Sequence, residues 1–192
     1  EVRRVRAYAA GFLAVGVFGL GAVVTLVDRP AVAAEATRAT QAPRRFERSY
    51  RYSGGAAGRE AIEAAVEQTV RKMNPLIRSI ARRRMLEANA VIPELGFDLG
   101  KDTIVASYAG GRIIETPADG RAVPWTDQFG DRIRVSHRMV GATLLQTMSG
   151  SNGDRINRYT FSADGTTMSM AVEIRSDKLP APLRYTVAYR RQ

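Results

Sequence analysis

One histidine and no cysteine limit the chemistry that this chain of 192 residues could perform. His137 lies in the segment 132–140, where alternation places it on the same face as Ile133 and Val135. A zinc or iron site needs several nitrogen or sulfur donors, so we expect no metal. His137 is then either a hydrogen-bonded residue on the inner face of a strand or a polar contact to a ligand.

Other polar side chains alternate with apolar ones in the strand-like segments that follow. Gln146 stands between Leu144 and Met148, which fits an inner polar anchor and an ordinary hairpin position equally well. Arg158 and Tyr159 point to opposite faces, and alternation does not decide which of them faces a cavity. The candidates for contacting a small-molecule ligand are Arg158, Tyr189, Gln146, His137, Met168 and Met170.

Signatures of common enzyme classes are missing from the sequence. There is no Gly-x-Ser-x-Gly elbow, no phosphate-binding loop and no dinucleotide-binding glycine motif. A triad would have to use His137, and nothing in the sequence orients it. Asp119, Asp127 and Asp131 could bind calcium, but their spacing is not that of the calcium-binding loop, and we favour turn chemistry. We therefore expect a noncatalytic protein without a cofactor.

From Leu95 onward the chain alternates in short blocks separated by turn dipeptides, among them Asn152-Gly153 and Asp164-Gly165. Short connections make successive strands antiparallel neighbours, and such a meander commonly buries one face by closing into a barrel. The segment 117–131 is expected to be a longer connection. The expected strands cover 46–53, 95–99, 103–108, 112–116, 132–140, 143–149, 155–162, 166–175 and 183–190.

Two helices are expected between the first strand and the meander, at about 58–89. Apolar residues at three- and four-residue spacing predict the first over 58–74. Asn74 can cap the second, because the proline after it is tolerated in a first helical turn. The expected fold class is α+β, mostly β. It is an antiparallel up-and-down β-barrel over 46–192, with a helix pair after its first strand and an N-terminal export or anchor helix.

The second helix combines an apolar side with a basic one. Leu76, Ile77, Ile80, Ala81 and Met85 form the apolar side. The basic side is either solvated or docks on an anionic membrane, with the arginine stems lying around the apolar stripe. The arginines concerned are Arg78, Arg82, Arg83 and Arg84.

The N-terminal residues 1–33 have the pattern of an export signal. Three arginines precede an uncharged apolar run, 7–27, and Ala31-Val32-Ala33 offers a small-x-small cleavage site. The run is also long enough to span a bilayer as a single anchor. In either case we expect the domain outside the cytoplasmic membrane, periplasmic or secreted, after a flexible linker at 34–45.

The formal net charge of +10 suggests a partner with an acidic surface, such as anionic lipid. Nucleic acid is the usual partner of such a charge, but the arginines are scattered along strands and are not interleaved with aromatic residues. We therefore expect no nucleic-acid binding.

The closing hairpins resemble those of the intracellular fatty-acid-binding proteins, members of the calycin group of lipocalin-like barrels. The matching residues are Leu144 to Thr147, the Asn152-Gly153 and Asp164-Gly165 turns, Arg158 and Met168. The resemblance implies a helix pair over the barrel mouth and a carboxylate held by basic residues and a tyrosine of the closing strands. Arg158 and Tyr189 match two of those positions, and Val187 stands where the family has a companion arginine.

Three functions fit the sequence. The first is noncatalytic carriage of a hydrophobic or amphipathic small molecule, such as a lipid. The second is an exported scaffold, its barrel filled by its own side chains, that docks on a protein or an anionic membrane through the Arg-rich helix. The third is a START-like helix-grip domain, which would normally end in a long helix. Cavity volume distinguishes the first two, because a carrier needs a lined and empty space.

Overall fold

The computed structural model describes residues 46–127 and 130–192. The segments predicted as a signal or anchor, 1–33, and as a linker, 34–45, lie outside the described residues. None of the helices within the described ranges is both long enough and apolar enough to cross a membrane.

Ten strands and two α-helices make up the described chain. The strands before and after the helix pair follow the expected order, and the helix pair comes directly after the first strand. The helices are α1 (Gly55–Val70) and α2 (Arg78–Ala88), joined through a short 3-10 turn (Pro75–Ile77). The strands are β1 (Arg48–Tyr52), β2 (Glu94–Leu99), β3 (Thr103–Tyr108), β4 (Arg112–Pro117), β5 (Val123–Thr126), β6 (Arg132–Val140), β7 (Thr143–Gly150), β8 (Gly153–Phe161), β9 (Thr167–Arg175) and β10 (Leu183–Arg191).

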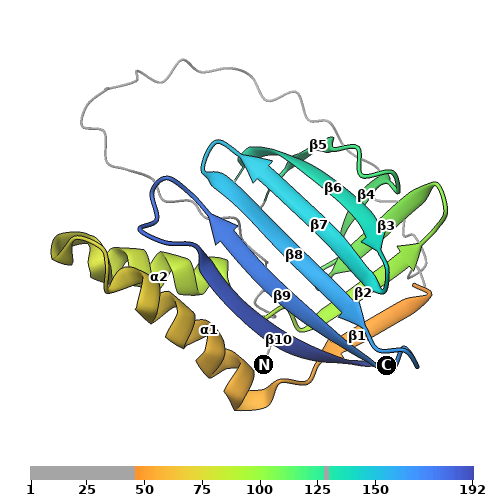
Figure 1. Cartoon of the computed structure of the whole chain (residues 1–192), viewed down its shortest axis with the longest axis horizontal. Coiled ribbons are helices and arrows are strands. Elements are labelled where there is room, and N and C mark those ends of the chain that lie inside the picture. Colours follow the sequence, from red (N-terminus) through yellow and green to blue (C-terminus); the bar gives the residue numbers. More distant parts are fainter. Residues whose placement is uncertain (1–45, 128–129) are drawn as a thin grey trace, which may run out of the picture. The chain divides into compact units, whose positions relative to one another are not determined.

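All ten strands belong to one antiparallel sheet with the order β4-β3-β2-β1-β10-β9-β8-β7-β6-β5. The sheet curls until its two ends approach, which makes a nearly closed barrel (Figure 1). Thr116 of β4 contacts His137 of β6, and a bridge joins Asp119 to Arg138, so the gap is narrow. The predicted up-and-down barrel with a helix pair after its first strand is confirmed.

The turns that the sequence predicted also close the hairpins. Gly165, at φ +69°, adopts the left-handed conformation between β8 and β9 that a side chain would strain. At the helix pair, the Asn74 side chain accepts a hydrogen bond from the Leu76 amide at 3.0 Å, so Asn74 caps the 3-10 turn, whereas α2 itself begins after Ile77 without a side-chain cap. Helix α1 begins three residues earlier and ends four residues earlier than expected.

The connection expected over 117–131 contains a strand that the sequence analysis missed. β5 pairs with β6, with Val123 opposite Val135 and Trp125 opposite Ile133. Pro124 weakened the strand pattern, because proline cannot donate to a ladder. It is tolerated here because β5 is the last strand of the sheet, with one side unpaired.

Alternation along the strands separates a packed inner face from an exposed outer one. On β8, Arg155, Asn157 and Tyr159 are buried, whereas Arg158 and Thr160 lie on the outside. Aromatic rings fill one part of the interior, with the Phe97 ring centroid 5.0 Å from Tyr159 and 5.8 Å from Phe161. The barrel interior is therefore a packed core.

Helix α1 packs along β10, and α2 lies beside α1 (Figure 1). Ile62, Val66 and Val70 recur at four-residue spacing on α1 and are buried, as the predicted apolar stripe requires. From α2, Ala81 and Met85 join the same core. The pair is thereby fixed against one side of the barrel, near the loop that leads to β2.

Candidate functional site

Gln146 is the centre of a buried hydrogen-bond network inside the barrel. Its amide nitrogen lies 2.6 Å from His137 Nε2 and 2.5 Å from the Tyr108 hydroxyl. Its carbonyl oxygen accepts from Asn157 Nδ2 at 2.7 Å and from the Tyr159 hydroxyl at 3.1 Å. The Gln146 amide therefore uses both donors and both acceptor positions, and the groups around it are satisfied by one another.

The same network fixes the state of His137. Because Gln146 donates to Nε2, the proton of the neutral ring is on Nδ1, which lies 2.9 Å from Thr116 Oγ1 and donates to it. Burial lowers the pKa of His137 to about 4. His137 is thus a neutral, hydrogen-bonded residue of the inner face, the first of the two interpretations drawn from the sequence.

The network continues through Arg155 to the end of α2. Arg155 Nε donates to Asn157 Oδ1 at 3.0 Å, and its two other nitrogens reach Asn89 Oδ1 and the Tyr185 hydroxyl, each at 3.1 Å. Asn89 in turn donates to the Met85 carbonyl at 2.8 Å. A continuous polar path therefore runs from β4 across the interior to the residue that ends α2.

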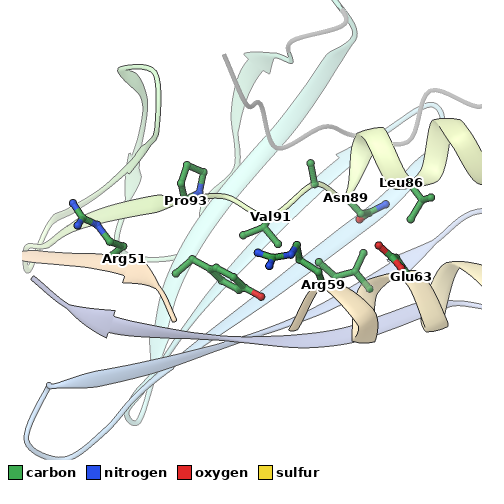
Figure 2. A pocket seen from close by; sticks show the side chains of 10 residues that line it. Arg51, Arg59, Glu63, Leu86, Asn89, Val91 and Pro93 are labelled. Carbon is green, nitrogen blue, oxygen red and sulfur yellow. The ribbon is translucent and has the colours of Figure 1, made fainter. Parts of the chain in front are cut away.

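Asn89 also borders a hollow at the surface, which we call the mouth pocket. It measures about 500 Å³ and lies between α1, the α2–β2 loop and β1 (Figure 2). Arg59 and Glu63 of α1 face Val91 and Leu86 across it (Figure 2). Its lining residues are Arg51, Tyr52, Arg59, Ile62, Glu63, Leu86, Asn89, Ala90, Val91 and Pro93.

The walls of the mouth pocket are held by short-range contacts. The Tyr52 hydroxyl donates to the Gly55 carbonyl at 2.8 Å, so the ring lies across the first turn of α1. Gly58 permits this, because a side chain there would collide with the Tyr52 hydroxyl. On the other wall, the Tyr189 hydroxyl donates to the Ile92 carbonyl at 3.0 Å and fixes the α2–β2 loop.

Of the predicted ligand contacts, five lie inside the barrel. His137 and Gln146 are network members, and Tyr189 supports the pocket loop. Met168 and Met170 are buried in the core. The structure thus places these five side chains on one inner face but packs them against their neighbours, and their proposed contact with a ligand stays a prediction.

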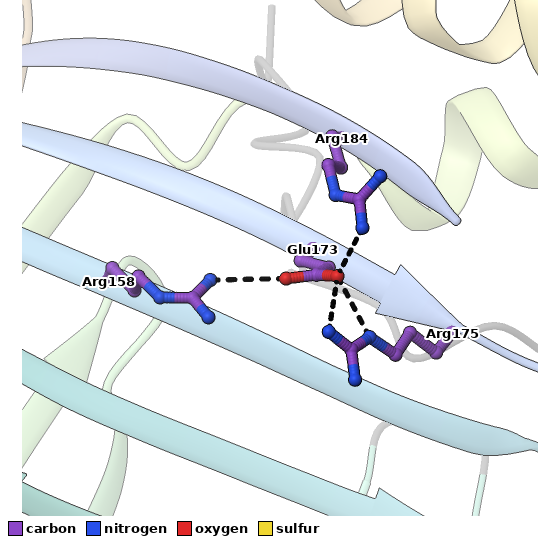
Figure 3. Close-up of polar contacts among 4 residues, drawn as sticks. All are labelled: Arg158, Glu173, Arg175 and Arg184. Carbon is purple, nitrogen blue, oxygen red and sulfur yellow. Dashed lines mark hydrogen bonds and ion pairs between the residues drawn. The ribbon is translucent and has the colours of Figure 1, made fainter.

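Arg158 lies apart from them, on the outer face of β8. It approaches the Glu173 carboxylate at 3.3 Å, and Arg175 and Arg184 bind the same carboxylate at 2.8 and 2.7 Å (Figure 3). Hydrogen bonds and charge from Arg175 and Arg184 lower the pKa of Glu173, whose side chain is largely buried beneath the arginines. The alternative left open by alternation is therefore decided: Tyr159 faces inward and Arg158 outward.

The apolar side expected for the second helix is only partly buried. Ala81 and Met85 pack inside, but Leu76, Ile77 and Ile80 are 85%, 50% and 39% exposed. We call these three residues the elbow, because they stand where the chain turns from α1 into α2. Leu76 and Ile77 belong to the 3-10 turn and Ile80 to the first turn of α2.

The basic residues of α2 surround this elbow. Arg82 binds Glu67 of α1 at 2.5 Å, and Arg78 donates to the Met73 carbonyl at 2.9 Å. Arg83 is exposed and Arg84 is half-buried. In the part of the chain that the structure describes, no group of three histidine, cysteine or acidic residues is arranged to hold a metal ion.

Comparison with known proteins gives a likeness of fold. No protein-family model matches the chain, and no curated protein matches it either. Among solved structures, the chain is similar to a fatty-acid-binding protein from brain tissue of Drosophila melanogaster, at 11% identity and a TM-score of 0.49 over 76% of this chain and 98% of that one. It is also similar to a Schistosoma mansoni fatty-acid-binding protein in complex with arachidonic acid, at 14% identity and a TM-score of 0.48 over 75% and 93%.

A third similar structure is the fluorescent protein UnaG, at 8% identity and a TM-score of 0.46 over 75% of this chain and 95% of that one. The barrel and helix pair that the sequence resemblance implied are those that the structure has.

Sequence reasoning missed most of the mouth pocket. Neither Arg59 nor Glu63 was among the predicted ligand contacts, and residue 89 entered only as the expected end of the helix pair. Only Asn89 carried a signal, since asparagine commonly ends helices. The pocket itself depends on how far the α2–β2 loop stands from α1, which no local pattern encodes.

Proposed function

We propose that this domain binds a hydrophobic or amphipathic small molecule in the mouth pocket, without catalysis. The observation that carries the proposal is a hollow of about 500 Å³, within the size range of ligand sites, in a protein whose barrel interior is packed. Ile62, Leu86 and Val91 offer apolar surface, and Arg59 and Glu63 offer polar groups.

The barrel interior is filled by its own side chains, which is what the scaffold interpretation expected, so we place the ligand outside the interior, in the mouth pocket. An interior ligand would have to displace the Gln146 network, leaving buried polar groups unsatisfied at about 1–3 kcal/mol each. A ligand in the mouth pocket displaces no such bond. Asn89 lines the pocket but is only 1% exposed and is already bonded to Arg155 and Tyr185, so it shapes the pocket wall.

The test is native mass spectrometry of the full chain purified from its own source, followed by organic extraction. A lipid-sized mass that is lost on denaturation supports the proposal. Ala90→Trp fills the pocket and should weaken binding of a fluorescent fatty-acid probe at least tenfold. Ala188→Trp, on the exposed face of β10, is the matched control and should bind like the parent. Equal binding by both variants would contradict the proposal.

The proposed site of action is outside the cytoplasmic membrane, based on the arginines, apolar run and Ala31-Val32-Ala33 of the N-terminal sequence. Fractionation and N-terminal sequencing of the native protein test this. A chain beginning at Ala34 indicates cleavage, and an intact chain in the membrane indicates an anchor. Recovery of the chain in the cytoplasm would contradict the proposal.

A second candidate function is docking on an anionic membrane through the elbow. The specific observation is that Leu76, Ile77 and Ile80 are exposed together beside the arginines of α2. The apolar side chains enter the membrane interface. Each arginine that meets an anionic head group contributes about 1 kcal/mol to the free energy of binding.

Neutralising Arg82, Arg83 and Arg84 to glutamine should therefore lower the affinity for phosphatidylserine vesicles roughly 100-fold. Neutralising Arg132, Arg134 and Arg138 on the exposed face of β6 removes the same charge and is the control. Equal losses in both triple variants would show that net charge alone, and no particular surface, governs binding.

A further inference from the structure

A second hollow adjoins the mouth pocket on β1 and β10, and we call it the basic hollow. It measures about 480 Å³ and shares Arg51 and Tyr52 with the mouth pocket. Arg51 lies at the end of the mouth pocket away from Asn89 and Leu86 (Figure 2). The basic hollow is lined by Arg51, Tyr52, Ser53, Arg190, Arg191 and Gln192.

The strand register brings two like charges together in this hollow. Arg51 of β1 stands directly opposite Arg190 of β10. Like charges directly opposite each other destabilise an antiparallel pair. No packing requirement explains this placement, since both side chains are exposed on the outer face.

The acidic residue nearby offsets only part of this charge. Glu94 of β2 binds Arg51 at 3.0 Å, and both side chains are more than half exposed. Within the described ranges, no carboxylate lies within ion-pair distance of Arg190. Arg191 donates to the backbone carbonyl of Glu47 at 3.1 Å. Because a carbonyl carries no net charge, this hydrogen bond does not neutralise Arg191.

We propose that the basic hollow binds an oxyanion, a phosphate or similar group, held between Arg51 and Arg190. Guanidinium groups present paired N–H donors that match such oxygens, and Ser53 adds a hydroxyl. The anion is either free or the head group of an amphipathic molecule whose apolar part lies in the mouth pocket. Only this second source rests on the proposed function.

The test measures binding of inorganic phosphate to the full chain by calorimetry. Arg190→Gln should weaken binding about tenfold or more, the loss typical of one charge-assisted hydrogen bond. Arg184→Gln, an arginine of the same strand outside the hollow, is the control and should bind like the parent. Glu94→Gln should tighten binding, because it removes the carboxylate that competes for Arg51. A purely structural role of these residues predicts no such opposite effects.

The proposal is overturned if Arg190→Gln binds phosphate as the parent does, or if Arg184→Gln loses as much. Monoacylglycerol and its phosphate monoester then distinguish the two sources. A head group in the hollow predicts that the monoester binds more tightly than the neutral lipid, and that Arg190→Gln removes the difference. Phosphate binding without binding of either lipid would leave the anion site standing and contradict the mouth pocket. Neutral-lipid binding without phosphate binding would support the mouth pocket and overturn the anion site.

Discussion

The polar groups of the barrel interior and those of the mouth pocket differ in whether they are bonded to one another. Inside, Gln146, Asn157 and Tyr159 satisfy one another with hydrogen bonds of 2.7–3.2 Å. At the mouth, Arg51, Arg59 and Glu63 border open space. A barrel of this size is commonly thought of as a container, but here the contained space is occupied by the chain itself.

This difference separates stability from binding. Removing an interior polar group leaves its partners buried and unsatisfied, whereas removing one at the mouth leaves its partners to water. We therefore expect interior substitutions to change the free energy of unfolding and mouth substitutions to change affinity.

Gln146→Leu should lower the free energy of unfolding by about 4 kcal/mol. It keeps the volume but leaves several buried partners of the amide, among them His137 and Tyr108, without their bonds at about 1–3 kcal/mol each. Urea denaturation measures the loss. Thr147→Ala, the neighbouring residue on the outer face, is the control and should change stability by no more than about 0.5 kcal/mol. A loss below 1 kcal/mol for Gln146→Leu would show that the interior admits water.

Lowering the pH should destabilise the protein through His137. Its pKa is about 4 when folded and near 6.5 when unfolded, so the unfolded chain binds the proton first. The free energy of unfolding keeps its full value above pH 6.5 and falls as the pH drops from 6.5 to 4. At pH 4 the loss due to His137 is about 3 kcal/mol. Glu173, whose pKa is lowered, loses its contribution only below its ordinary range.

Denaturation curves at several pH values measure this slope. His137→Gln should be less stable than the parent at pH 7, but its stability should be flat between pH 6.5 and 5. An equal slope in both proteins would assign the acid sensitivity to other groups.

Much of the fold could be predicted from the sequence, because it depends on local patterns. Alternation located nine of the ten strands, and Asn152-Gly153 and Asp164-Gly165 marked their turns. The failure was β5, where Pro124 in an edge strand hides a pairing that only β6 supplies. Alternation and turn dipeptides are local signals. They do not reveal a strand such as β5, which is held in place by pairing with β6.

The site was predicted less well, for a physical reason. His137 and Gln146 could be recognised as polar residues on an apolar face, but whether they meet a ligand or each other depends on distances across the barrel. The mouth pocket joins residues from β1, α1 and the α2–β2 loop, so no single segment shows it. Arg158, the match suggested by family resemblance, lies on the outer face. The sequence could not show this, because two-residue periodicity separates the two faces of a strand without saying which of them is inside.

Tyr189→Phe should cost about 1 kcal/mol of stability and also weaken ligand binding, because Tyr189 belongs to both regions. Its hydroxyl, whose pKa burial raises, stays protonated and donates to the Ile92 carbonyl beside the pocket. Tyr159→Phe is the comparison, since that hydroxyl bonds Gln146 and Asn157 away from the pocket and should affect stability alone. Probe affinity and urea denaturation of both variants measure the difference. If both variants bind like the parent, the α2–β2 loop is held without Tyr189.

The elbow offers the smallest expected change in stability and the clearest contrast with the interior. Leu76→Ser should alter the free energy of unfolding by no more than about 0.5 kcal/mol, because the side chain is already 85% exposed. Binding to phosphatidylserine vesicles should fall roughly tenfold, since a leucine that enters the interface contributes about 1.5–3 kcal/mol. Leu144→Ala, a fully buried leucine, should do the opposite, costing about 3 kcal/mol of stability with unchanged vesicle binding. Vesicle sedimentation and denaturation of the two variants complete the test. A stability loss above 1 kcal/mol for Leu76→Ser would mean that the elbow packs against the protein in solution, and the membrane would then have no apolar surface to meet there.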